Sequence, residues 1–165
     1  MSVSRSALKV APRVEGKACV SIVRGKSPYE MVREAFALIE VDRVIEPGDT
    51  VLVKPNFSAL WRLPLRGSLT SPEALEAVVR AVREDTEAGE VIIAEGSGGS
   101  QTWRCFFKFK VPEIAVKHGA RLVDLNWDEA QKVQVQNGYV LKEFWPARTI
   151  HQVADVVISL PVLKI

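Results

Sequence analysis

Short apolar runs alternate with amphipathic segments along this chain. The runs rich in valine and isoleucine have the length of buried strands and cover residues 18–25, 50–54, 90–95, 120–126 and 154–165. Between them, residues 27–41, 71–85 and 111–119 repeat apolar positions at helical spacing. Strand and helix alternation with uniformly apolar strands is typical of a sheet covered on its faces. The pattern predicts an α/β fold, a mostly parallel sheet with helices packed on it.

Local signals support these elements. Ser27–Pro28 and Ser71–Pro72 each combine a capping hydroxyl with a proline that suits the first helical position. Residues 132–144 alternate around Asn137–Gly138, a strong code for a tight turn. We therefore expect a small antiparallel hairpin insertion near the edge of the sheet.

Length and composition limit the classes of protein. The chain has 165 residues, is 47% hydrophobic and carries a net charge of +2, which argues against nucleic acid as a partner. Its apolar runs are far shorter than the roughly 20 residues that span a bilayer, and we expect no membrane association. Residues 1–17 read as a flexible lead-in, and residues 18–165 as a single domain. No secretory signal is visible, so a cytoplasmic location is expected.

Polar residues follow three of the predicted strands directly. Lys54 and Asn56 follow the second strand, a glycine-rich stretch that begins at Glu95 follows the third, and Asp124 ends the fourth. Ligands of open α/β sheets lie outside the carboxyl ends of the strands, where these segments should converge. The predicted cofactor-binding residues are Lys54, Asn56, Glu95, Gly96, Ser97, Gly98 and Lys164.

Each of these residues has a functional and a structural interpretation. Lys54 suits a phosphate or carboxylate, or it extends its ammonium to solvent past a strand end. Asn56 offers a donor and an acceptor to a ligand, or it caps a turn. The loop Gly96–Ser100 presents N–H groups to an anion, or it is a plain turn; it matches neither phosphate-binding glycine motif. Glu95 is a candidate acid–base group or metal ligand.

Further segments leave their chemistry open. Asp124, Asn126 and Asp128 fit either a hard metal ion or turn capping. The stretches around Trp61 and Trp103 mix aromatic and basic residues, as a lid, a protein interface or a single-strand binding surface would. Cys19 and Cys105 form no Cys-x-x-Cys pair, so the chain has no iron–sulfur cysteine motif and the cofactor stays unknown. Both are expected to be packed, although Cys105 beside Arg104 is also a candidate reactive thiol.

Five ordered stretches resemble one family. They are PGDTVLVKPNF, TSPEALEAVVRAV, VIIAEGSG, KHGARLVDLN and ADVVISLPVLK, and together they are similar to domain-of-unknown-function family 362. Its members are often found alone or joined to a ferredoxin-like segment with four-iron clusters, so the resemblance implies an α/β domain and leaves a redox context open. The family pattern at the last stretch has a lysine where Val162 stands and a threonine where Ile165 stands. Members continue further, so we expect residues 18–165 to be the N-terminal part of a longer domain.

Two hypotheses follow. The first is an enzyme or binding domain for an anionic small molecule or redox cofactor at the carboxyl ends of the strands, with the reaction open. The second is a non-catalytic interaction module, in which an unpaired sheet edge and exposed apolar surface bind a second copy or a completing partner chain.

Overall fold

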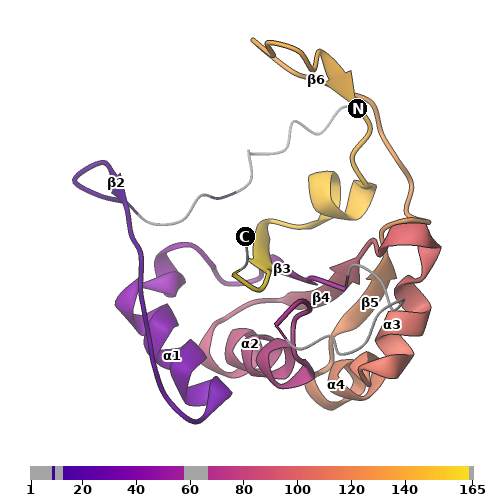
Figure 1. The fold of residues 1–165 in the computed structure, drawn as a ribbon. Coiled ribbons are helices and arrows are strands. Elements are labelled where there is room, and N and C mark those ends of the chain that lie inside the picture. The colour runs from indigo at the N-terminus through magenta and orange to yellow at the C-terminus, as the bar shows by residue number, and fades with distance from the viewer. Residues whose placement is uncertain (1–8, 10–12, 58–66, 164–165) are drawn as a thin grey trace.

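A four-stranded parallel sheet forms the centre of the protein (Figure 1). The computed structural model describes residues 9, 13–57 and 67–163. In the order β5-β4-β3-β8, the strands are β5 (Arg121–Asp124), β4 (Glu90–Glu95), β3 (Thr50–Pro55) and β8 (Val156–Leu160). Every neighbouring pair is parallel. The predicted α/β class is confirmed.

The described residues form four α-helices: α1 (Pro28–Leu38), α2 (Pro72–Asp85), α3 (Thr102–Lys108) and α4 (Val111–His118). The predicted caps are present, because Ser27 accepts from the N–H of Glu30 and Ser71 from that of Ala74. Gly119 ends α4 at φ 62°, a left-handed conformation that glycine adopts without steric penalty.

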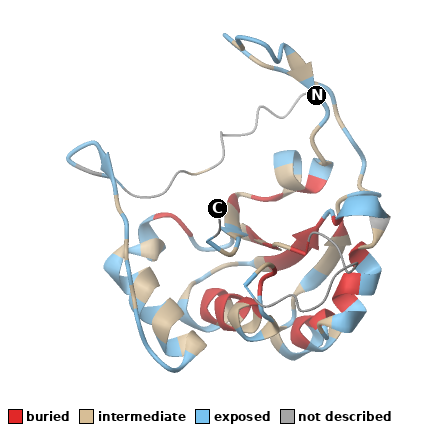
Figure 2. Ribbon diagram, viewed as in Figure 1, coloured by how far each residue is buried: buried red, intermediate tan, exposed pale blue. Residues whose placement is uncertain are grey.

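The sheet buries its two faces differently. One face, with Val51, Val53 and Ile93, packs in a large core with α2, α3 and α4. The opposite face, with Leu52 and Ile92, packs against the short π-helical turn η3 (Thr149–Val153). Buried residues accordingly concentrate in the strands and on the inner sides of α2, α3 and α4 (Figure 2). Main-chain segments at the ends of β3 and β4 are therefore held in place from both sides.

The remaining elements are short. Two 3-10 turns, η1 (Val41–Arg43) and η2 (Gly98–Ser100), follow α1 and β4. Strands β6 (Val133–Gln134) and β7 (Glu143–Phe144) form the predicted hairpin as a separate two-stranded sheet, which projects away from the body of the protein (Figure 1).

The first predicted strand is wrong. Of residues 18–25 only Ala18 lies in a strand, because β2 (Lys17–Ala18) pairs with β1 (Arg13–Val14) in a small hairpin. Val20 and Ile22 are 82% and 91% exposed. The flexibility of residues 1–17 stays a prediction; within them, Lys9 contacts Asp49 at 2.7 Å. No helix among the described residues has the length and apolar character needed to cross a membrane.

Candidate functional site

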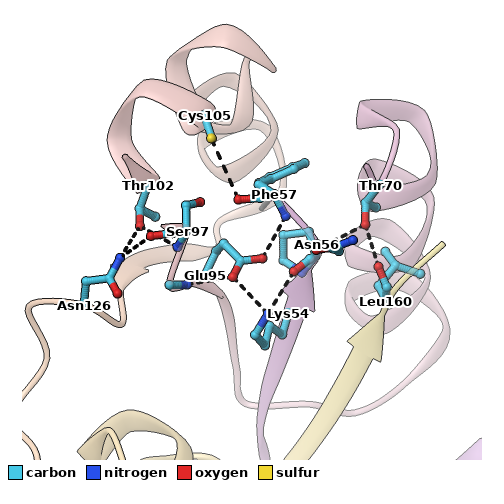
Figure 3. A network of polar contacts seen from close by, with 12 residues as sticks. Lys54, Asn56, Phe57, Thr70, Glu95, Ser97, Thr102, Cys105, Asn126 and Leu160 are labelled. Carbon is cyan, nitrogen blue, oxygen red and sulfur yellow. Dashed lines mark hydrogen bonds and ion pairs between the residues drawn. The ribbon is translucent and has the colours of Figure 1, made fainter. Parts of the chain in front are cut away.

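Predicted site residues meet at one edge of the sheet. This carboxyl edge comprises residues 54–57 after β3, residues 95–97 after β4, residues 124–126 after β5, and Leu160 at the end of β8. Figure 3 shows their polar contacts, with Glu95 at the centre. The convergence expected from the sequence is therefore present for the segments after β3, β4 and β5. Lys164 and Trp61 lie outside the described residues.

Glu95 ties the ends of β3 and β4 together. It is 3% exposed, and its carboxylate accepts from the ammonium of Lys54 at 2.9 Å, the N–H of Gly96 at 2.7 Å and the N–H of Phe57 at 3.0 Å. A buried carboxylate is stable when it is paired and hydrogen-bonded in this way. Its oxygens are thus occupied by the protein, which favours a supporting role over one as acid–base group or metal ligand.

Lys54 keeps one side of its ammonium accessible. The group donates to Glu95 and to the carbonyl of Pro55 at 3.3 Å, which leaves one of its three N–H groups for solvent or a ligand. The side chain is 36% exposed. Lys54 is therefore a positive group that Glu95 holds in position at the surface of the carboxyl edge.

Asn56 closes the loop that follows β3. Its backbone N–H donates to the hydroxyl of Thr70 at 2.8 Å, and its side-chain amide donates to the carbonyl of Ser68 at 3.2 Å. Thr70 in turn donates to the carbonyl of Leu160 at 2.5 Å. Thr70, which sequence reasoning missed, joins β3 to β8; its position directly before the Ser71 cap was the available signal.

The glycine-rich loop is anchored by side chains. Ser97 N–H donates to the hydroxyl of Thr102 at 3.1 Å, and the Asn126 amide donates to the Ser97 carbonyl at 2.9 Å. The N–H groups of Gly96 and Ser97 are therefore used internally, whereas Gly98 is exposed. The Ser97 hydroxyl is buried without a hydrogen-bond partner among the described residues.

The acidic residues at the end of β5 and after it accept hydrogen bonds from backbone N–H groups. Asp124 accepts from the N–H of Asn126 at 3.0 Å, and Asp128 accepts from the N–H groups of Glu129 and Thr149. Turn capping of this kind was one of the two interpretations of these residues. Within the part of the chain that the structure describes, no three His, Cys, Asp or Glu side chains gather in a possible metal site.

Cys105 faces the same network from α3. Its thiol is buried and lies 3.9 Å from the carbonyl of Phe57. Burial raises the pKa of the thiol. Because only the thiolate is nucleophilic, the structure favours a packed cysteine over a reactive one.

We expect Cys105 to resist a thiol reagent in the folded protein. With Ellman's reagent at mildly alkaline pH, the half-buried Cys19 should react first and Cys105 only after denaturation. Cys19→Ser is the control and should remove the fast phase. A fast phase that persists in this variant would show that Cys105 is accessible as a thiolate.

Comparison with known proteins identifies a family without a described activity. No curated protein and no solved structure matches the chain. The model of a domain of unknown function, DUF362, matches residues 51–165. This stretch contains the parallel sheet except Thr50, the first residue of β3, together with α2, α3 and α4. The chain therefore belongs to the DUF362 family.

Proposed function

We propose that the carboxyl edge binds a small anionic molecule, such as a phosphorylated or carboxylated metabolite or an anionic redox cofactor. The strand order carries the proposal. From β3 the chain adds β4 and then β5 on one side, and it returns to place β8 on the other side of β3. In open α/β sheets, ligands bind where the strand order reverses, outside the carboxyl ends of the strands.

The reversal lies between β3 and β8, at the end of β3 that carries Lys54. Lys54 and Ser159 are register partners there, and Pro55 pairs with Leu160. Helices α2, α3 and α4 pack on one face of the sheet, whereas the connection from β5 to β8 reaches the other face through η3. The connections from β3 to β4 and from β5 to β8 thus leave the sheet in different directions at this point, as connections do at the ligand sites of open α/β proteins.

Lys54 supplies the charge that such a ligand requires. Its free N–H group and partial exposure allow it to contact an anion without leaving Glu95. The Asn56 amide oxygen, which accepts no hydrogen bond from the described residues, adds an acceptor beside it. Since Glu95 holds the ammonium before a ligand arrives, little side-chain entropy is lost on binding.

A thermal-shift screen with a matched variant tests the proposal. A bound anion should raise the free energy of unfolding by mass action, by about 2.7 kcal/mol at one hundred times its Kd. The melting temperature should rise accordingly. Lys54→Ala should abolish this rise. Lys132→Ala is the control, because Lys132 also pairs with a glutamate, Glu143 at 2.6 Å, but lies in the separate hairpin.

The ligand-induced shift, rather than the melting temperature itself, is compared between variants, since Lys54→Ala also unpairs Glu95. A shift that survives in Lys54→Ala, or disappears in Lys132→Ala, would contradict the proposed site. No shift with nucleotides, phosphorylated metabolites or carboxylates would contradict anion binding altogether and favour an interaction module.

One observation supports that second function. Apolar side chains are exposed in and around the hairpin, where Trp127, Tyr139 and Trp145 are 78%, 97% and 58% exposed. Exposed apolar surface of this kind is typical of protein interfaces. We infer that, if the chain acts as an interaction module, the hairpin is the surface that a second copy or a partner chain would cover.

A further inference from the structure

A groove lies outside the carboxyl edge, on the helical layer of the protein. It has a volume of about 460 Å³ and is lined by the start of α2, the α3–α4 junction and α4. Pro72, Phe109 and Ile114 supply its apolar surface. Small-molecule sites are commonly of this size and combine an apolar floor with a few polar groups.

Charged side chains of both signs line this groove, and most of them are exposed to solvent. Lys108, Lys110, Glu73 and Glu113 form no side-chain hydrogen bond or ion pair with any described residue. Two other charged residues of the groove are paired, because Lys117 forms an ion pair with Glu76 at 2.6 Å. Glu73 and Glu113 have a structural explanation, since acidic residues in the first turns of α2 and α4 stabilise the helix dipoles. Lys108 has the same explanation, because it is the basic residue in the last turn of α3, so Lys110 is the one of the four that needs another.

Lys110 occupies a conformation that is unfavourable for a lysine. It joins α3 to α4 with φ 54° and ψ 34°, in the left-handed region where glycine is the usual residue. Its side chain forms no helix cap. The preceding residue, Phe109, stacks on Phe57 with ring centroids 4.9 Å apart, which holds the junction in place. Strained residues of this kind concentrate at ligand sites, where contacts of the side chain with the ligand offset the cost of the backbone conformation.

We propose that this groove binds a small zwitterion with an apolar body, of the α-amino-acid class. The carboxylate of the ligand lies towards Lys108 and Lys110, its ammonium towards Glu73 and Glu113, and its side chain on Phe109 and Ile114. An anion alone would leave the glutamates unpaired beside its own charge, whereas a zwitterion satisfies both signs. The site is separate from the proposed anion site at Lys54.

An NMR titration of the full chain tests the ligand class with three probes that share one ring. L-phenylalanine has both charges, phenethylamine lacks the carboxylate and hydrocinnamate lacks the ammonium. We expect amide shifts at Phe109, Lys110 and Ile114, with L-phenylalanine binding at least about threefold more tightly than either other probe, as expected for exposed charge pairs. Equal affinities, no binding, or shifts confined to residues 54–57 would overturn the proposal.

A substitution at Lys110 separates binding from stability. Lys110→Gly should weaken L-phenylalanine binding at least about threefold while the melting temperature stays equal or rises, because glycine relieves the left-handed strain. The matched control is Glu40→Gly, which removes another charged residue with positive φ (51°) outside the groove and should leave binding unchanged. Unchanged binding in Lys110→Gly, or a variant that does not fold, would contradict the argument. Neither result bears on anion binding at Lys54.

Discussion

Replacing Glu95 with alanine is expected to lower the free energy of unfolding by about 3 kcal/mol. The substitution leaves the N–H groups of Phe57 and Gly96 without their acceptor and removes the partner of Lys54. Phe57 is fully buried, so water cannot replace the lost carboxylate there without opening the core. Urea unfolding followed by circular dichroism measures the change.

The same strand supplies the control. Glu90 begins β4 and pairs with Arg121 at 2.7 Å, but both side chains are more than 40% exposed. Glu90→Ala should therefore change stability by less than about 1 kcal/mol. If the two alanine variants lost similar stability, Glu95 would not be the fastening residue that its three hydrogen bonds indicate.

Phe106→Ala should lower the free energy of unfolding by about 4 kcal/mol, as truncations of buried aromatic residues do. The Phe106 ring is 0% exposed and meets Phe57 edge to face at a centroid distance of 6.4 Å. It also contacts Trp103 at 5.6 Å. Loss of this ring removes one of the contacts between α3 and the carboxyl edge, beside those of Thr102 and Cys105, so the ligand-induced shift at Lys54 should weaken as well.

The adjacent residue tests whether burial, rather than ring chemistry, determines this effect. Phe107 lies on the same helix and is 68% exposed. Phe107→Ala should change stability by no more than about 0.5 kcal/mol. Chemical denaturation of the two variants under identical conditions gives the comparison, and a large loss in Phe107→Ala would mean that the outer side of α3 is packed in solution.

The elements with clear local signals were predictable. Residues 51–53 and 91–94 are uniformly apolar and lie in the central strands β3 and β4, and the Ser71–Pro72 pair begins α2 as expected. Asn137–Gly138 lies in the connection of the predicted hairpin. Asn137 has a positive φ of 58° but Gly138 does not, and the paired strands end at Gln134 and Glu143, so the connection is longer than the two-residue turn that Asn-Gly favours.

The failures lie where pairing decides the structure. Residues 18–25 have the composition of a strand, yet a strand forms only if a neighbour offers its backbone, and only Lys17 and Ala18 find one. In residues 20–22 the side chains alternate in their surroundings. Val20 and Ile22 are exposed, whereas the Ser21 hydroxyl donates to the Ala35 carbonyl. Helix α3 was overlooked although Thr102, Cys105 and Phe106 occur at helical spacing and form its buried side.

At the candidate site, the sequence predicted the meeting of segments but not their bonding. The parallel arrangement was sufficient to bring Lys54 and Glu95 to one edge. That Glu95 would also accept two N–H groups, and that Thr70 would connect β3 to Leu160, depends on how Phe57 and Thr70 lie against the strand ends, which no local pattern encodes. Proximity in a sheet can be inferred from strand order, whereas hydrogen-bond partners require coordinates.

The position of β8 has a consequence for synthesis on the ribosome. The Thr50 N–H at the start of β3 donates to Asp155, 105 residues later in the chain. Strand β8, which follows Asp155, is the neighbour of β3 on the side opposite β4. While the nascent chain is shorter than this, one edge of β3 has no strand beside it, although its residues are among the most apolar in the protein. An unpaired apolar strand invites contacts with other chains. Between translation of Val51 and of Val156, this edge of β3 is therefore open to pairing with other chains.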